Sequence, residues 1–283
     1  MKTALLYIAI GEYTVFFDSF YRSCEKYFLP NSEKTYFVFS DKQDKSFCRE
    51  NVIVIETPNM GWPDNTLKRF HLFTSIEKKL QQFDYCFFFN ANLEFVKSVS
   101  EEMLPESGII VVRHPGYYNR TRKDFPYDTN KNSLAYISEN EGSVYVCGGV
   151  NGGKTADYMK MCNELKNRVD KDYANATVAK WHDESHLNRY LVDINEDDYV
   201  VWHSGFCYPD FYRMNVEEIC HLKDKSYYIN IDKKKKLNFI DWVYRTLFTE
   251  QRFFTIKRYF FRKEYEKLLS EGNDLGFFVD KQR

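Results

Sequence analysis

The chain has 283 residues, of which 43% are hydrophobic and 18% aromatic, and its 40 Lys and Arg residues are balanced by 41 Asp and Glu residues. This composition is too apolar for a disordered chain, and no apolar run reaches the roughly 18 residues of a membrane span. A net charge of −1 excludes a global attraction to nucleic acid or to anionic lipid. We therefore expect a soluble globular protein with one large domain, an additional segment and no nucleic-acid partner.

The cysteines and the N-terminus bear on the compartment. Seven cysteines are widely spaced and include no CxxC pair, which favours reduced, buried thiols over disulfides or zinc ligation. An apolar run over residues 3–10 follows Lys2, but Gly11 and Glu12 end it without the small-residue cleavage site of a signal peptide. We expect a first core strand here and a cytoplasmic protein.

Strands alternate with helices along the first part of the chain, which favours a mostly parallel, Rossmann-like α/β sheet flanked by helices. In such sheets ligands bind beyond the carboxyl ends of the strands, so the site is expected near Gly11, Asn90 and His114. Short apolar runs predict strands, and helical spacing of apolar residues predicts helices. The predicted strands cover residues 3–10, 36–39, 52–55 and 85–89, and the predicted helices cover residues 14–28 and 65–80.

The second half continues the pattern with strands over residues 108–113, 143–147 and 199–203 and helices over residues 154–169 and 181–192. Between them lie the glycine pairs Gly148-Gly149 and Gly152-Gly153. The pairs either form turns or allow the backbone to approach a bulky ligand closely.

The last part of the chain differs in character. Residues 232–263 carry ten Lys or Arg residues, three acidic residues and many aromatic ones. We expect a main domain over residues 1–231 and a basic, aromatic, helical appendage over residues 232–283. The appendage either packs on the main domain or forms a basic amphipathic surface for peripheral contact with a membrane.

The first notable motif is Asn90-Ala91-Asn92, directly after the aromatic strand 85–89. Asparagine is a common turn residue, so the motif has a structural interpretation. Two carboxylates at this spacing would hold a divalent cation, whereas neutral carboxamides hold one poorly. The amides can instead donate hydrogen bonds to phosphate or sugar oxygens.

The second motif is the run WHDESHLN, residues 181–188. His182 and His186 are one helical turn apart, as in zinc sites, but Asp183 rather than a glutamate follows the first histidine. A helix start whose acids, Asp183 and Glu184, lie near the positive end of the helix dipole is the structural interpretation. The third interpretation is a functional cluster, because one Trp, two His and two carboxylates together are more than a helix cap needs.

Several motifs occur in one order and carry a resemblance: LEF after the asparagine pair, HPGYY, AYI, the glycine pairs and WHDESHLNRYL. In this order the chain resembles the family 6 retaining glycosyltransferases, which include the mammalian blood-group A and B transferases, and especially their bacterial members. The similarity spans residues 3–210. It implies a GT-A fold and transfer of galactose or N-acetylgalactosamine from a UDP-sugar, with retention, to the 3-hydroxyl of a galactoside.

The resemblance also implies that no metal or other cofactor is used. Mammalian members carry D-x-D and need manganese, whereas this chain has Asn90 and Asn92, as bacterial members do. Other donors must then stabilise the negative charge that develops on the leaving UDP. The candidates are Asn90, Asn92, Arg69, Lys223 and Lys225.

For the donor, the resemblance assigns Ile8, Ile10 and Tyr13 to the uridine pocket, and Asp64 and Arg69 to the sugar and phosphates. Cys147 and Gly149 match the pair that discriminates between donor sugars in the blood-group enzymes. Gly149 leaves room for an acetamido group, so UDP-N-acetylgalactosamine is preferred to UDP-galactose. The complete predicted donor site is Ile8, Ile10, Tyr13, Asp64, Arg69, Asn90, Ala91, Asn92, Cys147, Gly148, Gly149 and Asp183.

For the acceptor, a fucosylated galactoside, the resemblance implies contacts from His114, Tyr117, Tyr145, Trp181 and Asp210, while Pro126 replaces a threonine contact of mammalian members.

Glu184 takes the catalytic position, as a covalent nucleophile or as an electrostatic stabiliser of an oxocarbenium-like state. Two alternatives to such an enzyme remain: an inactive glycan- or nucleotide-sugar-binding module on the same fold, and a zinc hydrolase.

Overall fold

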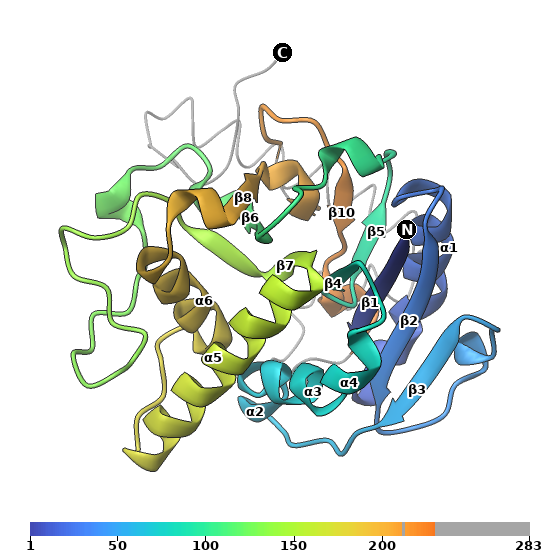
Figure 1. The fold of residues 1–283 in the computed structure, drawn as a ribbon, viewed down its shortest axis with the longest axis horizontal. Coiled ribbons are helices and arrows are strands. Elements are labelled where there is room, and N and C mark those ends of the chain that lie inside the picture. The colour runs from blue at the N-terminus through green and yellow to red at the C-terminus, as the bar shows by residue number, and fades with distance from the viewer. Residues whose placement is uncertain (211–212, 230–283) are drawn as a thin grey trace, which may run out of the picture.

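The computed structural model describes residues 1–210 and 213–229. The predicted appendage over residues 232–283 and its boundary at residue 231 lie outside the described residues. The described part forms a central sheet with helices on both faces and a smaller second sheet (Figure 1).

The central sheet confirms the predicted mixed α/β architecture. Its seven strands follow the order β3-β2-β1-β4-β7-β6-β8, and every neighbouring pair is parallel except the two pairs that include β7. The sheet is thus mostly parallel with a single antiparallel strand. The strands are β1 (Lys2–Ile8), β2 (Glu33–Ser40), β3 (Val52–Glu56), β4 (Tyr85–Phe89), β6 (Ile109–Arg113), β7 (Val146–Lys154) and β8 (Tyr199–Trp202).

Two hydrophobic clusters cover the two faces of this sheet. Alternation along β1 directs Leu5 and Tyr7 into one cluster and Ala4 and Leu6 into the other. The first cluster is closed by α1 and the second by α3, α5 and α6. The helices are α1 (Phe17–Tyr27), α2 (Asp64–Leu67), α3 (Arg69–Ser75), α4 (Glu77–Leu80), α5 (Thr155–Ala174) and α6 (His182–Asp193).

Two predicted helices differ in detail from the observed ones. The helix predicted over residues 14–28 begins as the 3-10 helix Gly11–Phe16 before α1. The helix predicted over residues 65–80 is divided into α2, α3 and α4, because Lys68 and Ile76 depart from helical backbone angles. Arg69, at the start of α3, is buried.

Strand β7 corrects the prediction for the glycine pairs. The strand was predicted to end at Cys147, but it continues through both pairs to Lys154, so the pairs do not form turns. A Cβ atom on Gly152 would lie 2.2 Å from Phe87 Cδ1 in β4, and one on Gly153 would lie 2.5 Å from the Gly108 carbonyl oxygen. Glycine is therefore required where β7 passes close to its neighbours.

A second sheet with the order β5-β10-β9 lies beside the end of β4. Its strands are β5 (Leu93–Phe95), β9 (Tyr208–Pro209) and β10 (Cys220–Leu222). Asn92, before β5, donates from Nδ2 to the Lys223 carbonyl (2.5 Å), and its own carbonyl accepts from the Lys223 N–H (3.0 Å). This pairing places residues 223–229 next to the carboxyl ends of the central strands.

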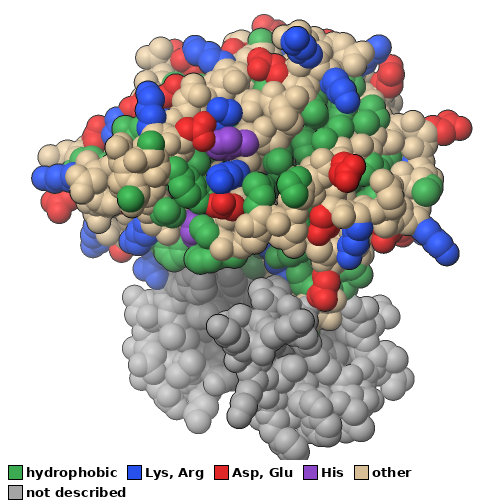
Figure 2. All heavy atoms as spheres, turned by 90° about the horizontal axis from the view of Figure 1, so that it is seen from below, with side chains coloured by type: hydrophobic (Ala, Val, Ile, Leu, Met, Phe, Trp, Pro, Cys, Tyr) green, Lys and Arg blue, Asp and Glu red, His purple; other side chains and the backbone are tan. Residues whose placement is uncertain are grey.

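None of the helices in residues 1–210 and 213–229 is long and apolar enough to cross a membrane. Figure 2 shows one face of the molecule, on which acidic and basic side chains are interspersed over the described part. This distribution agrees with the balanced charge of the sequence.

We predict that Gly152→Ala lowers the free energy of unfolding by about 1–3 kcal/mol, because the added methyl group meets Phe87 and the Cys86 carbonyl in a packed core. Urea denaturation of both proteins measures this difference. Gly149→Ala is the matched control, since the atoms nearest its Cβ belong to the side chain of Asn90, which faces the cleft, and not to the backbone or the core. Equal losses in the two variants would contradict the packing argument.

A second prediction concerns His221 in β10. Burial alone would lower its pKa, but hydrogen bonds to Asp210 (2.6 Å) and Glu218 (2.6 Å) outweigh burial and raise the pKa to about 9. Because the folded pKa lies above the ordinary value of 6.5, the protonated ring stabilises the fold below pH 6.5 and this contribution is lost as pH rises through 9.

The free energy of unfolding of the wild type, relative to His221→Gln, should therefore fall by up to about 3 kcal/mol between pH 6 and pH 10. Urea denaturation of both proteins at pH 6, 8 and 10 measures it. A difference that does not change with pH would show that the charged ring is not stabilised by the two carboxylates.

Candidate functional site

A cleft of about 570 Å³ opens where the carboxyl ends of β1 and β4 meet the glycines of β7 and the start of α6. This is the edge of the sheet at which the site was expected. Eleven of the predicted site residues line it: Ile8, Ile10, Tyr13, Arg69, Asn90, Ala91, Gly148, Gly149, Trp181, Asp183 and Glu184.

The Glu184 carboxylate is held from two sides at the start of α6. Its Oε1 accepts a hydrogen bond from the Tyr145 hydroxyl (2.7 Å), and its Oε2 accepts one from the Gly148 N–H (2.8 Å). Burial raises the pKa of Glu184, while these two bonds and the charge of Arg69 act in the opposite direction. The result is an oriented carboxylate that faces a cleft, at the positive end of a helix.

Arg69 and Asp183 form a buried ion pair next to Glu184. The Arg69 Nε atom lies 3.0 Å from Asp183 Oδ2, and the side chains of both residues are less than a tenth exposed. The Arg69 Nε–H donates to the Thr66 carbonyl (3.3 Å), so the contact with Asp183 is an attraction of charges rather than a directed hydrogen bond. Burial raises the pKa of Asp183 to about 7, against the effect of Arg69.

The structure separates the two asparagines. Asn90 lines the cleft, and its amide lies beside Gly149, where a Cβ atom would be 2.6 Å from Nδ2. Asn92 does not line the cleft; it is 2% exposed and bonds to Lys223. Only the first amide is therefore placed to meet a ligand in the cleft.

The structure also distinguishes the two candidate lysines. Lys223 bonds through Nζ to Ser19 (2.8 Å) and Glu94 (2.5 Å), away from the cleft. Lys225 lines the cleft, with Nζ 5.2 Å from the centre of the Tyr13 ring, and no ion pair joins it to a carboxylate in the described part of the chain. Burial lowers the pKa of Lys225, and the charge of Arg69 lowers it further.

Aromatic side chains predicted to contact the acceptor gather behind Glu184. Tyr117 and Tyr145 pack with Phe125 and Tyr127 in one cluster. The ring of His114 lies 5.1 Å from Tyr117 and 5.5 Å from Tyr145, and burial lowers the pKa of His114 to about 4, so its ring is neutral. His114, Tyr117 and Tyr145 are not among the residues that line the cleft. Tyr145 nevertheless contacts the cleft through its hydrogen bond to the Glu184 carboxylate.

Trp181 lies at the rim of the cleft and is 47% exposed. Its indole Nε1 donates to the Pro126 carbonyl (3.1 Å), so the backbone of Pro126 fixes the orientation of this ring.

Three predicted residues have polar or buried contacts elsewhere. Asp64 bonds to Lys68 (2.9 Å) and to the Tyr173 hydroxyl. Asp210 pairs with His221 and accepts from the Asp224 N–H (2.9 Å). Cys147 is buried in the core. Because none of the three lines the cleft, their predicted ligand contacts remain predictions without a place in this geometry.

Sequence reasoning missed the loop before α2 and the start of that helix, which together form one side of the cleft. Asn59, Trp62, Asn65 and Thr66 all line it, and Trp62 is 80% exposed. The Asn65 Nδ2 donates to Asn59 Oδ1 (2.8 Å), which braces the loop. The signal was present as an aromatic residue between turn-forming Gly61 and Pro63, but only Asp64 was selected from this stretch.

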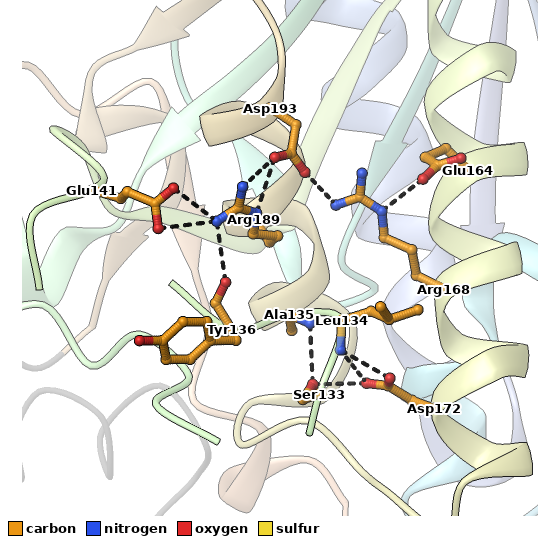
Figure 3. A network of polar contacts seen from close by, with 10 residues as sticks. All are labelled: Ser133, Leu134, Ala135, Tyr136, Glu141, Glu164, Arg168, Asp172, Arg189 and Asp193. Atoms are coloured by element: carbon orange, nitrogen blue, oxygen red, sulfur yellow. Dashed lines mark hydrogen bonds and ion pairs between the residues drawn. The ribbon is translucent and has the colours of Figure 1, made fainter. Parts of the chain in front are cut away.

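The long segment between β6 and β7 is fixed to the helices by charged side chains (Figure 3). Arg189 of α6 donates to the Tyr136 carbonyl (3.2 Å) and pairs with Glu141 (3.2 Å), while Asp172 of α5 accepts from Ser133 (2.7 Å) and from the Leu134 N–H (2.9 Å). These contacts fix the segment to α5 and α6, and its residues Phe125 and Tyr127 pack against Tyr145.

The two histidines of the second motif, His182 and His186, have different surroundings. His186 is 1% exposed and packs near Asp172 (3.6 Å), whereas the ring of His182 contacts Trp62 at 5.0 Å between centres. Within residues 1–210 and 213–229, no group of three or more His, Cys, Asp and Glu residues is arranged to hold a metal ion.

Comparison with known proteins agrees with this geometry. The sequence profile of glycosyltransferase family 6 matches residues 2–207. The O-antigen biosynthesis glycosyltransferase WbnI of Escherichia coli is 38% identical over 237 residues, which are 82% of this chain and all of that protein.

Vertebrate relatives match over a shorter region. The histo-blood group ABO system transferase 1 of Rattus norvegicus is 31% identical over 66% of this chain, and the globoside alpha-1,3-N-acetylgalactosaminyltransferase 1 of Gallus gallus is 30% identical over 65%. The matched regions are 56% and 55% of those two proteins, so the chain spans about half of their length. The extent of the family match and the similarity to WbnI show that this chain is a glycosyltransferase and belongs to family 6.

Proposed function

We propose that the protein is a metal-independent, retaining glycosyltransferase that transfers N-acetylgalactosamine, in preference to galactose, from a UDP-sugar to a fucosylated galactoside in α-1,3 linkage. The observation that carries the proposal is the oriented Glu184 carboxylate, which faces a cleft that also holds two basic side chains, Arg69 and Lys225. The name of the globoside alpha-1,3-N-acetylgalactosaminyltransferase among its relatives supports the sugar and the linkage.

The nucleotide would bind at the end of the cleft formed by Ile8, Ile10 and Tyr13. Two apolar walls and an aromatic ring suit a flat base. Lys225 lies over the Tyr13 ring, so its ammonium group is next to the position of the diphosphate in this arrangement. Asn90, which follows the neighbouring parallel strand β4, adds amide N–H donors.

These groups offer an alternative to a metal ion. A cation near a leaving diphosphate lowers the energy of the transition state by stabilising charge that develops there. None of the ion pairs among the described residues involves Lys225, and its position in the cleft supports a contact with the diphosphate. Lys223 is neutralised by Glu94 instead.

In the reaction, the bond between the anomeric carbon and the diphosphate oxygen breaks, the electron pair leaves with UDP, and the acceptor 3-hydroxyl forms the new bond to that carbon and loses its proton. Glu184 would stabilise the positive charge on the sugar, as a neighbouring anion or through a covalent intermediate. Hydrogen bonds from Tyr145 and Gly148 keep both oxygens of its carboxylate oriented, which is the preorganisation that such a role requires.

The first prediction is transfer of N-acetylgalactosamine from UDP-N-acetylgalactosamine to 2′-fucosyllactose that survives excess EDTA. Rates are measured with UDP-N-acetylgalactosamine and UDP-galactose, with 2′-fucosyllactose and lactose, and with EDTA or added manganese.

Glu184→Gln should lower the rate by about a hundredfold or more. Near-normal turnover in this variant would exclude both roles of Glu184.

Each other outcome has its own meaning. Activity only with manganese would contradict metal independence, and faster transfer of galactose would reverse the donor preference. Binding of UDP-sugar or of 2′-fucosyllactose without any transfer would favour the non-catalytic binding module.

The second prediction separates the two lysines. Lys225→Met should weaken UDP binding by roughly 10- to 100-fold, because a charged hydrogen bond of about 1.5–3 kcal/mol is removed. Isothermal titration calorimetry measures the dissociation constant of UDP. Lys223→Met is the control, since this lysine bonds to Ser19 and Glu94 outside the cleft. A larger effect in the control would assign the diphosphate contact to Lys223.

A further inference from the structure

Both backbone polar groups of Gly148 are bonded to side chains rather than to a neighbouring strand. The N–H donates to Glu184 Oε2 (2.8 Å), and the carbonyl accepts from Arg69 Nη1 (2.6 Å) and from Asn151 Nδ2 (3.2 Å). The orientation of this one residue therefore sets the direction of an N–H that holds the carboxylate of Glu184.

A β-bulge explains why side chains are needed here. Val112 of β6 pairs with Cys147, whereas the preceding Val111 pairs with Asn151, so residues 148–150 have no partner in β6. On the other side, β4 pairs with β7 only as far as Val150. Cys147 still pairs with Val112, and the Gly149 carbonyl accepts from the Asn90 N–H (2.7 Å), so the chain is held on either side of Gly148. The Gly148 carbonyl itself is held by Arg69 and Asn151 in place of a neighbouring strand.

The Asn151 amide is itself oriented by a second buried contact. Its Oδ1 accepts a hydrogen bond from the Tyr158 hydroxyl (2.7 Å), and the two residues are 1% and 0% exposed. A flipped amide would direct Oδ1 at the carbonyl oxygen of Gly148 and would leave the Tyr158 hydroxyl without its acceptor. Tyr158, in the first turns of α5, thus selects the orientation in which Nδ2 reaches Gly148.

We propose that Asn151, oriented by Tyr158, is a positioning residue for Glu184 that acts through the Gly148 backbone. The inference rests on the proposed function, since Glu184 is the group that we place against the transferred sugar. Asn151 does not line the cleft and touches no ligand position, which distinguishes it from Arg69. Three hydrogen bonds in series connect the core with the carboxylate: from Tyr158 to Asn151, from Asn151 to Gly148, and from Gly148 to Glu184.

The electrostatic surroundings of Glu184 define what the test must resolve. Its carboxylate interacts with groups from several sides of the cleft floor, none of which is substituted in a variant at Tyr158, although Arg69 also interacts electrostatically with Tyr158. These groups are Arg69, Tyr117, Tyr145, Cys147 and Asp183.

The test is Tyr158→Phe, which removes the hydroxyl that orients Asn151 and that also contacts Cys162 in the core. The hydrogen bond from the Gly148 N–H lowers the pKa of Glu184. When this bond is weakened, the pKa of Glu184 should rise by about 0.5 to 1. The Gly148 amide resonance follows this titration in protein labelled with ¹⁵N-glycine, and the chain has only 12 glycines to assign. The acidic limb of the kcat profile should move upward by the same amount.

Steady-state kinetics give the second readout. We expect kcat to fall by about 3- to 10-fold with the KM for the UDP-sugar unchanged, because the substrate contacts are retained. Tyr36→Phe is the matched control: it also removes the hydroxyl of a fully buried tyrosine, which bonds to Glu25 (2.7 Å) and contacts the buried thiol of Cys24, away from the cleft. Its Gly148 titration and kcat should equal those of the wild type.

Asn151→Asp provides a second variant with an intact Tyr158. The aspartate keeps an acceptor for Tyr158 but presents an oxygen in place of Nδ2 to the Gly148 carbonyl, so a larger loss of kcat and a larger upward displacement of the titration are expected. A Gly148 titration in Tyr158→Phe that coincides with the wild type would overturn the inference. If the wild type transfers no sugar at all, the proposed function fails, while the titration still decides whether Asn151 positions Glu184.

Discussion

The site depends on the close packing of one antiparallel strand within an otherwise parallel sheet. Strand β7 passes between β4 and β6, and a Cβ atom on Gly152 or Gly153 would overlap atoms of these neighbours. The same strand then loses its pairing with β6 at the bulge, which frees the backbone of Gly148. Close packing at one end of β7 and the loss of strand pairing at the other together place a backbone N–H against Glu184.

Charge is concentrated at the floor of the cleft and is balanced there. Two carboxylates, Asp183 and Glu184, lie with Arg69 and Lys225 in a region where burial raises the pKa of both acids and lowers that of the lysine. Such groups are costly to bury alone, so each is held by a partner or faces the cleft. The arrangement suits a reaction in which positive charge develops on a sugar and negative charge on a diphosphate.

The walls of the cleft are built differently on its two sides. On one side, Arg189 and Asp172 hold a long segment through its backbone, and the Tyr145 hydroxyl reaches Glu184 from the aromatic cluster behind. On the other side, Trp62 is 80% exposed, next to the hydrogen bond between Asn59 and Asn65. A wall held by buried polar contacts and a more exposed one therefore lie on the two sides of the Glu184 carboxylate.

The sequence by itself determined the alternation of strands and helices, the edge of the sheet at which the cleft opens, and Glu184 as its central carboxylate. The first two followed from local periodicity, which is encoded in neighbouring residues, and Glu184 followed from the family resemblance that the WHDESHLN motif carries. The tertiary structure alone decided that the glycine pairs lie in a strand, that Asn90 but not Asn92 faces the cleft, and that Lys225 rather than Lys223 supplies the cleft with a cation. Each of these depends on contacts between residues far apart in the chain, such as Gly152 with Phe87 or Asn92 with Lys223, and no local pattern records such contacts.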